Sequence, residues 1–281
     1  MKVQSTEKKI RLDSNNHIKN KKKETLFKFQ ELYDYINQYK TKDKQILLSL
    51  VLPAYNEEKS IKRILESLPN DKSIEIIVID DDSTDGSVKE IQKVNNHRKL
   101  KLLRHKKNRG YGGAIITGIK HANGEVIVTM DSDGQHSPKD IIQLIKPIFE
   151  HEVDCTIGSR YLGGNYYALP SLTRLGEAII EKLLHIFFGQ KVMNSQNGFR
   201  AFSRKLSPIF RDAKYYGFTY ATEMIILTLI NGYKIKECPI KVYERAYGVS
   251  KISMRKLVLN LFICFLQYYY QKLLMLFSRK K

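Results

Sequence analysis

The sequence predicts an α/β protein built on a mostly parallel sheet, and two observations lead to that prediction. Apolar runs of four to eight residues recur along the chain, and each is followed by a polar loop that starts a segment with helical periodicity. This alternation is typical of βα units, in which helices join parallel strands and flank the sheet. Acidic residues follow several runs, and in such folds ligands bind at the carboxyl ends of the strands.

The periodic segments place the elements in order along the chain. Strands are expected near residues 47–54, 74–80, 100–104, 125–131, 153–158 and 235–243. Helices are expected near residues 57–68, 85–95, 111–122, 138–150, 171–188 and 219–231. A chain of 281 residues can bury one sizeable core, and we place the central domain at residues 46–250.

The N-terminal segment, residues 1–45, is expected to form a polar, lysine-rich tail followed by a short helix within 25–39. Apolar residues recur there with helical spacing, so the helix would pack on the domain or on a membrane. Its apolar face would be formed by Leu26, Phe29, Ile36 and either Leu32 or Tyr33. No apolar run follows the initial methionine, so no secretory signal is expected.

The C-terminal segment, residues 251–281, predicts a basic amphipathic helix at a membrane interface. Residues 257–277 are mostly apolar, and about 21 residues are enough to span a bilayer. A narrow polar stripe nevertheless runs along the segment and consists of Lys256, Asn260, Gln267, Gln271 and Ser278. Together with Lys272 and the flanking basic residues, this stripe favours a helix lying in the interface with its charges toward the headgroups. A single span and ordinary core packing are the alternatives.

The net charge of +19 indicates an anionic partner. Nucleic acid is disfavoured because the chain has no helix-turn-helix, zinc-finger or RNA-binding signature, and the acidic triplet at 80–82 would repel a polyanion. An anionic membrane surface fits better, since each nearby lysine or arginine contributes about 1 kcal/mol there. Cys155, Cys238 and Cys264 lack metal-ligand spacing, which is typical of buried cysteines in a reducing compartment.

Two groups of acids follow expected strands. Asp131 and Asp133 are two residues apart where a strand ends, so both carboxylates can turn toward one cation. Such oxygen ligands suit Mg²⁺ or Mn²⁺, which bind few protein carboxylates and complete their shell with water and phosphate. Residues 80–82 carry three acids after an earlier strand. Helix capping is the alternative interpretation, but it accounts for one acid at a strand end and not for three in a row.

Seven short motifs occur in an order that resembles the family-2 glycosyltransferases of the GT-A (Rossmann-like) fold. The likeness is to the dolichyl- or polyprenyl-phosphate hexose (mannose or glucose) synthases and covers about residues 46–255. The motifs are PAYNEE at 53–58, IDDDSTD at 79–85, NRGYGGA at 108–114, DSDGQH at 131–136, GSRY at 158–161, QNGFR at 196–200 and RAYGVSK at 245–251. The resemblance implies inverting transfer of a hexose from GDP-mannose, UDP-glucose or UDP-GlcNAc to polyprenyl (dolichyl) phosphate. The reaction would take place at the cytoplasmic face of a membrane.

The resemblance also implies roles for individual residues in binding the nucleotide sugar. Pro53, Tyr55 and Glu57 would hold the base and ribose, and Asp80 would accept hydrogen bonds from the base edge. Gln135 would assist the paired aspartates as a neutral metal ligand or as a neighbour of the metal site.

Three cations would bind the donor phosphates. Arg160 and Arg245 present guanidinium groups that match phosphate oxygens, and Lys251 follows in the same glycine-containing segment as Arg245. That segment would close over the donor and exclude water. We therefore expect Asp133, Arg160 and Arg245 to take part in catalysis.

A phosphate acceptor needs no strong general base, because its oxyanion is already a nucleophile. Arg174 and Arg200 are candidate ligands for the acceptor phosphate, with surface ion pairs as the alternative. The helix expected over 172–188 would form either a groove wall beside the lipid tail or part of the core.

The sequence departs from the family pattern at two positions, since Asp82 replaces a usual glycine and Asn194 a frequent aspartate. A processive polysaccharide synthase is disfavoured because the chain has no tryptophan for a Gln-x-x-Arg-Trp motif. A dehydrogenase is disfavoured because the glycines at 110–113 do not form G-x-G-x-x-G and follow the third strand. A glycosyltransferase with a non-lipid acceptor and a non-catalytic nucleotide-sugar-binding membrane protein remain alternatives.

Overall fold

The computed structural model describes residues 28–42, 45–96, 100–165, 171–245 and 254–278. These residues form one seven-stranded sheet in the order β3-β2-β1-β4-β6-β5-β7. The strands are β1 (Leu48–Ala54), β2 (Ile74–Asp80), β3 (Lys101–Arg104), β4 (Val126–Thr129), β5 (Cys155–Asn165), β6 (Arg200–Ser203) and β7 (Ile235–Val242). Neighbouring strands are parallel except where β6 pairs with β4 and β5, so the predicted mostly parallel sheet is confirmed.

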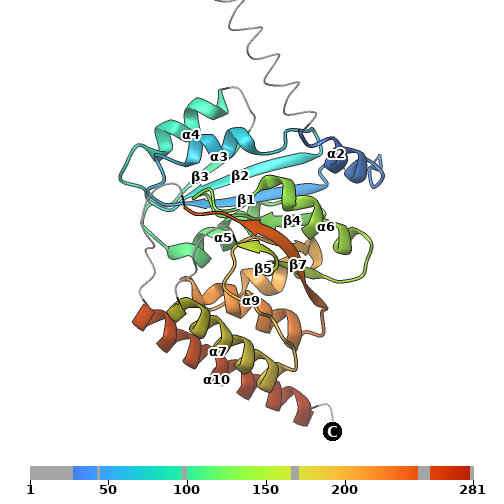
Figure 1. Ribbon diagram of the computed structural model, residues 1–281, viewed down its shortest axis with the longest axis vertical. Helices are drawn as coiled ribbons and strands as arrows, with labels where there is room; N and C mark the ends of the chain where they lie inside the picture. The colour runs from blue at the N-terminus through green and yellow to red at the C-terminus, as the bar shows by residue number, and fades with distance from the viewer. Residues whose placement is uncertain (1–27, 43–44, 97–99, 166–170, 246–253, 279–281) are drawn as a thin grey trace, which may run out of the picture.

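Helices cover both faces of the sheet (Figure 1). One face carries α2 (Gln30–Asn37), α3 (Ile61–Ser67), α4 (Ser87–Asn95) and α6 (Ile141–Phe149). The other face carries α5 (Gly110–His121), α7 (Ser171–Phe188), α8 (Ser207–Arg211), α9 (Thr219–Ile230) and α10 (Met254–Ser278). Because β1, β2 and β4 are buried on both faces, they are almost entirely apolar, as a parallel sheet between two helical layers requires.

The N-terminal helix α2 packs on the central domain. Phe29, Leu32, Tyr33 and Ile36 are all at most 5% exposed and belong to the core on that face of the sheet. The Tyr33 hydroxyl also accepts a hydrogen bond from the Asn70 amide at 2.8 Å. The predicted apolar face is therefore confirmed for these residues and contacts protein, while Leu26 lies outside the described residues.

The C-terminal helix α10 packs one face on α7 and α9, through Leu261, Cys264, Phe265 and Tyr268. Its opposite face is apolar and exposed. No helix in the described part of the chain is long and apolar enough to cross a membrane. Two residues that were predicted to face the headgroups contact protein instead. Gln267 of the polar stripe accepts a hydrogen bond at Oε1 from the Tyr215 hydroxyl, and Lys272, which was named beside the stripe, donates from Nζ to the Phe187 carbonyl at 2.8 Å.

Two elements are absent from the sequence prediction. β6 (Arg200–Ser203) inserts antiparallel between β4 and β5, and α8 (Ser207–Arg211) follows it after a 3₁₀ turn at Arg204–Leu206. Both are too short to show a periodic pattern. β5 also continues to Asn165, beyond the expected end at residue 158. Its pairing with β7 is irregular between Ser159 and Gly164 and resumes at Gly164.

Candidate active site

A cavity of about 330 Å³ opens at the carboxyl ends of β1, β2 and β4. Pro53, Tyr55 and Glu57 line it from the loop after β1, and Asp131 and Asp133 line it from the loop after β4. The parallel order of these strands brings their following loops to one edge of the sheet, which is where α/β folds bind ligands. The structure thus brings together the predicted residues of the first and fourth motifs.

The two aspartates after β4 occupy an electrostatically unfavourable pocket. Burial and the nearby Asp133 raise the pKa of Asp131 to about 7. Asp133 is 4% exposed and accepts hydrogen bonds from the Gln135 amide at 3.0 Å and from Arg245 Nη2 at 2.6 Å. Arg245 also lines the cavity. The pair therefore carries more negative charge than its surroundings compensate, which favours binding of a cation.

His136 lies beside this pair. Its side chain packs on Phe199, with ring centroids 5.1 Å apart, and its Nδ1 is 3.9 Å from Asp131 Oδ2. Burial lowers the pKa of His136 to about 4, so the imidazole is neutral at neutral pH. Nδ1 has no hydrogen-bond partner among the described residues. The sequence prediction did not assign a role to this histidine.

The QNGFR motif forms the loop before β6, and the geometry of that loop requires its glycine and its arginine. A Cβ at Gly198 would collide with the Asp131 carboxylate, so glycine is required for the loop to approach it. Arg200 is 1% exposed and holds the loop by donating to the carbonyls of Asn197 at 2.7 Å, Ser195 at 2.6 Å and Ala221 at 2.5 Å. The prediction that Arg200 binds an acceptor phosphate is wrong, because its guanidinium is buried and engaged with the backbone.

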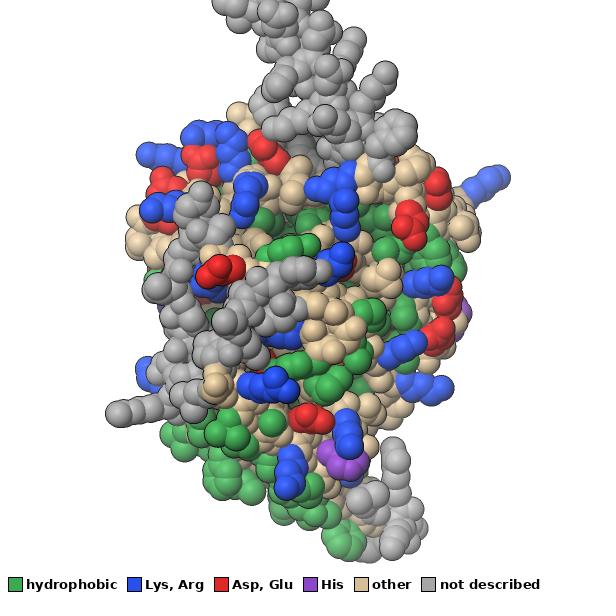
Figure 2. All heavy atoms as spheres, viewed as in Figure 1, with side chains coloured by type: hydrophobic (Ala, Val, Ile, Leu, Met, Phe, Trp, Pro, Cys, Tyr) green, Lys and Arg blue, Asp and Glu red, His purple; other side chains and the backbone are tan. Residues whose placement is uncertain are grey.

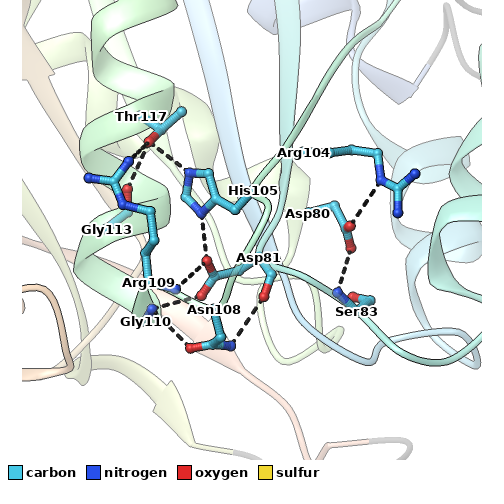
Figure 3. Close-up of polar contacts among 10 residues, drawn as sticks. All are labelled: Asp80, Asp81, Ser83, Arg104, His105, Asn108, Arg109, Gly110, Gly113 and Thr117. Carbon is cyan, nitrogen blue, oxygen red and sulfur yellow. Dashed lines mark hydrogen bonds and ion pairs between the residues drawn. The ribbon is translucent and has the colours of Figure 1, made fainter.

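Figure 3 shows the acids after β2, which are held by the protein itself. Asp81 accepts hydrogen bonds from the Arg109 and Gly110 amides, both at 2.8 Å, and contacts His105 Nδ1 at 2.6 Å. It therefore caps the N-terminus of α5 and also lines the cavity. Asp80 is fully buried, lies 3.4 Å from Arg104 Nε and is not among the lining residues. The structure thus brings Asp81, and not the predicted Asp80, to the cavity wall.

The far wall of the cavity comes from the start of α5 and from residues 214–218, which we call the 214–218 loop. Tyr111 stacks on Phe218, with ring centroids 5.3 Å apart and planes within 10°, and both line the cavity. The sequence prediction missed both aromatic residues. The NRGYGGA motif was a signal for Tyr111 alone, and it was recognised without a role for its tyrosine.

A model of glycosyl transferase family 2 matches residues 49–209, which contain the cavity's two groups of acids. The chain belongs to this family. It is 32% identical to the UDP-N-acetylglucosamine–dolichyl-phosphate N-acetylglucosaminyltransferase of Methanococcus voltae, over 73% of this chain and 89% of that one. It is 31% identical to the dolichol-phosphate mannosyltransferase of Pyrococcus furiosus, over 73% of this chain and 59% of that one. The family-2 enzyme is therefore a glycosyltransferase, as the sequence predicted.

A solved structure supports the fold of this family-2 glycosyltransferase. Glucosyl-3-phosphoglycerate synthase from Mycobacterium tuberculosis, in complex with UDP, superposes with a TM-score of 0.63 over 80% of each chain. The two sequences are 20% identical, so the likeness concerns the fold. The predicted GT-A architecture agrees with it.

The other predicted site residues of the glycosyltransferase are placed as follows. Arg160 is not among the cavity-lining residues; its Nε donates to Asn194 Oδ1 at 3.1 Å and its Nη2 lies 3.7 Å from Glu177 Oε1. The side-chain Nε2 of Gln135 donates to the Tyr243 carbonyl at 3.2 Å. Arg174 is exposed on α7. Lys251 lies outside the described residues, and its predicted role stays a prediction.

The departure from the family pattern at Asp82 has a backbone explanation. Asp82 adopts a φ of 67°, in the left-handed region that glycine enters most easily. Aspartate is among the few other residues that adopt this conformation without a large penalty. The usual glycine is therefore replaced by a residue that keeps the same turn.

The residues at the carboxylate pair fit a divalent cation. No group of three or more His, Cys, Asp and Glu side chains in the described part of the chain forms a complete ion site. Asp131 and Asp133 are nevertheless enough for Mg²⁺ or Mn²⁺, which commonly take one or two protein carboxylates and complete the shell with phosphate and water. The raised pKa of Asp131 marks a position where positive charge would be stabilised, and the unpartnered Nδ1 of His136 lies 3.9 Å from that carboxylate.

Proposed function

We propose that this family-2 glycosyltransferase transfers a hexose, with inversion, from a nucleotide sugar to a polyprenyl (dolichyl) phosphate. The observation that supports a lipid acceptor is an exposed apolar surface formed by α7 and α10. The names of two relatives support the same acceptor class, because both contain dolichyl or dolichol phosphate.

The nucleotide would bind between the loop after β1 and the start of α5. Pro53, Tyr55 and Glu57 line one side of the cavity, and Tyr111 and Phe218 supply a stacked aromatic wall on the other. A largely apolar cavity with a few placed polar groups suits a base and ribose. Asp81 is the carboxylate positioned to accept a hydrogen bond from the base edge.

The diphosphate would lie against the carboxylate pair. Asp131 and Asp133 would hold a Mg²⁺ or Mn²⁺ ion, which neutralises the diphosphate and stabilises it as a leaving group. Arg245 is already beside this position, since its guanidinium contacts Asp133. When a nucleotide sugar binds, the same guanidinium is within reach of the phosphate oxygens and can bind two of them at once.

The acceptor phosphate supplies its own nucleophile. One of its oxygens attacks the anomeric carbon of the hexose, the bond from that carbon to the diphosphate breaks, and the nucleoside diphosphate leaves with the electron pair. No proton has to be removed from the attacking oxygen, so no side-chain base is needed. The chain's task is to hold two anions in line, for which Arg174 near the start of α7 is a candidate.

The lipid tail and the membrane would meet the exposed apolar surface of α7 and α10. Figure 2 shows hydrophobic side chains gathered at the lower end of the molecule, over these helices. The exposed residues are Leu175, Ile179, Ile186, Val258, Leu259, Phe262, Ile263, Leu266, Tyr270, Leu274 and Phe277. Both helices begin on the side of the molecule where the sheet's parallel strands end (Figure 1). With a net charge of +19, association with the anionic cytoplasmic face of a membrane is favoured.

A donor and acceptor panel tests this function. Purified protein would be incubated with radiolabelled GDP-mannose, UDP-glucose or UDP-GlcNAc, Mn²⁺ or Mg²⁺, and anionic vesicles that contain polyprenyl phosphate. We expect one donor to give a lipid-linked product, and we expect none when polyprenyl alcohol replaces the phosphate. The variant Phe262→Ser/Leu266→Ser should sediment less with vesicles and lose turnover on long-chain acceptors more than on short ones.

A preference for polyprenyl alcohol or for a soluble phosphorylated acceptor would contradict the lipid-phosphate proposal. The enzyme would then act on a non-lipid acceptor, and the apolar surface of α7 and α10 would have to bind protein instead of lipid.

A further inference from the structure

A buried carboxylate links the C-terminal helix to the cavity. Glu223 on α9 is fully buried and accepts hydrogen bonds from the amides of Lys214 at 2.7 Å and Tyr215 at 3.0 Å. The hydroxyl of Tyr268, which α10 contributes, donates to the same carboxylate. Burial raises the pKa of Glu223, and these three donors oppose that effect. A carboxylate in this position fixes one end of the 214–218 loop to α10.

A second contact between the same elements lies beside the first. The Tyr215 hydroxyl donates to Gln267 Oε1 on α10 at 3.2 Å. The Lys214 ammonium lies 5.5 Å from the centre of the Tyr268 ring, within range of a cation–π interaction. The loop therefore follows the position of α10 through side-chain hydroxyls and not through apolar packing alone.

The other end of the 214–218 loop forms part of the cavity wall. Gly217 and Phe218 line the cavity, and the Tyr216 carbonyl accepts a hydrogen bond from the Gly113 amide at 3.0 Å. Glycines at the start of α5 make this close approach possible. A Cβ at Gly110, whose φ is 79°, would lie 2.8 Å from the Tyr216 carbonyl oxygen. A shift of the loop would therefore move the stacked aromatic pair in the cavity.

We propose that Glu223 and Tyr268 are positioning residues through which the C-terminal helix sets the wall of the nucleotide-sugar cavity. This inference rests on the proposed donor site. Neither residue lines the cavity, so both act through the 214–218 loop. Because the exposed face of α10 is the proposed lipid-facing surface, the helix that contacts the membrane would also shape donor binding. Linkage makes such a coupling reciprocal, so if membrane contact changes donor affinity, donor binding changes membrane affinity by the same factor.

The experiment compares two single-hydroxyl deletions on one helix. Tyr268→Phe removes the donor to Glu223, whereas Tyr270→Phe removes a hydroxyl from a residue that is 64% exposed. Binding of UDP and GDP in the presence of Mn²⁺ would be measured by calorimetry without lipid, well below the melting temperature of each variant. We expect Tyr268→Phe to weaken nucleotide binding by about fivefold or more, on the scale of a modest coupling between sites. Tyr270→Phe should stay within about twofold of the unmodified protein.

A fluorescence arm makes the result independent of nucleotide binding. The chain contains no tryptophan, so Phe218→Trp introduces a single reporter at the cavity wall. In ligand-free protein, adding Tyr268→Phe should shift the emission to the red and lower its anisotropy, while adding Tyr270→Phe should change neither. If Tyr268→Phe does not fold, Tyr215→Phe removes the second contact to α10 and should give the same changes with smaller amplitude.

Each alternative result has a definite meaning. Unchanged emission and unchanged nucleotide affinity in Tyr268→Phe would overturn the inference, as would equal losses in the Tyr268→Phe and Tyr270→Phe variants. If the unmodified protein bound neither nucleotide, the proposed donor site would fail, while the emission of the reporter would still decide whether Tyr268 positions the loop.

Discussion

The acids at the ends of β2 and β4 look alike in the sequence and differ in the structure. At the end of β2, Asp81 accepts hydrogen bonds from two backbone amides and contacts a histidine ring nitrogen, and Asp80 lies beside an arginine. After β4, the Asp131 carboxylate has a pKa of about 7, because burial and Asp133 oppose its ionisation. The first group is stabilised by the protein itself. The second group would be stabilised by a cation that the protein does not supply.

This difference indicates that the role of an acidic residue at the end of a strand depends on the groups that its carboxylate faces. A carboxylate that faces a helix N-terminus is paired within the chain, and its loss should lower stability in addition to removing any contact with the donor. A carboxylate that lies beside another carboxylate in the cavity wall would depend on an external cation, and its loss should affect mainly activity. The predictions below test this division, beginning with the largest expected effect.

Asp133→Asn should lower turnover by about a hundredfold or more, on the scale of one preorganised electrostatic contact, because it removes a charge from the proposed ion site. The melting temperature should change little, since the substitution also relieves repulsion with Asp131. Initial rates at saturating Mn²⁺ and donor would measure the effect, with Asp34→Asn on the exposed face of α2 as the control. Near-normal activity of Asp133→Ala together with insensitivity to EDTA would refute the metal assignment.

Asp81→Ala should destabilise the protein by about 3 kcal/mol, because it leaves the Arg109 and Gly110 amides and His105 without their charged partner. Urea unfolding would measure the change, with Asp34→Ala as the control. Added Mn²⁺ should not restore the lost stability. A cost below about 1 kcal/mol would mean that water replaces Asp81 at the start of α5, and the contrast between the two groups of acids would be lost.

The pH dependence of stability should reveal the carboxylate pair in metal-free protein. The pKa of Asp131 is about 7 in the folded state against 3.8 for an ordinary aspartate, so the proton binds the folded state more tightly. Protonation of Asp131 therefore stabilises the folded state. This contribution to the free energy of unfolding is fully present below about pH 4 and is lost as the pH rises to about 7. Melting temperatures of the unmodified protein should therefore fall over this range relative to those of Asp131→Asn, by a few degrees.

The control for this measurement is the ion itself. Mn²⁺ at pH 7.5 should raise the melting temperature of the unmodified protein and leave that of Asp131→Asn almost unchanged. If the two proteins keep a constant difference from pH 4 to pH 8, Asp131 titrates normally, and the pair would not need a cation.

Much of the fold was predictable because its signals are local. The buried strands β1 and β2 are continuous apolar runs, and α7 was predicted over the residues that form it. β6 was not predictable, because it has only four residues and pairs with strands far away in the sequence, for example Val126 with Ser203. The packing of α10 on α7 and α9 was predicted only as an alternative, because the sequence does not show that Gln267 and Lys272 contact protein and not headgroups.

The site was predictable where a residue pattern has one common function at the end of a strand. Paired aspartates after a strand indicated a cation position, and the structure places both at the cavity. Arg200 was misassigned because a buried arginine that binds carbonyls looks the same in sequence as one that binds phosphate. Asp81 was passed over for Asp80 because the sequence does not show which of two adjacent side chains faces the cavity. Phe218 gave no signal, since its role depends on a loop that meets α5 only in the folded state.

The ion pair between Asp133 and Arg245 has a consequence for biosynthesis. The two residues are 112 positions apart, so one side of the cavity is translated long before the other. At about 5 to 20 residues per second, Arg245 is added about 6 to 22 s after Asp133. During that interval the emerging chain holds the crowded carboxylates of the β4 loop without the arginine that faces them. A ribosome-bound chain that ends before β7 should therefore expose an anionic, incomplete cavity and be unable to enclose a nucleotide sugar.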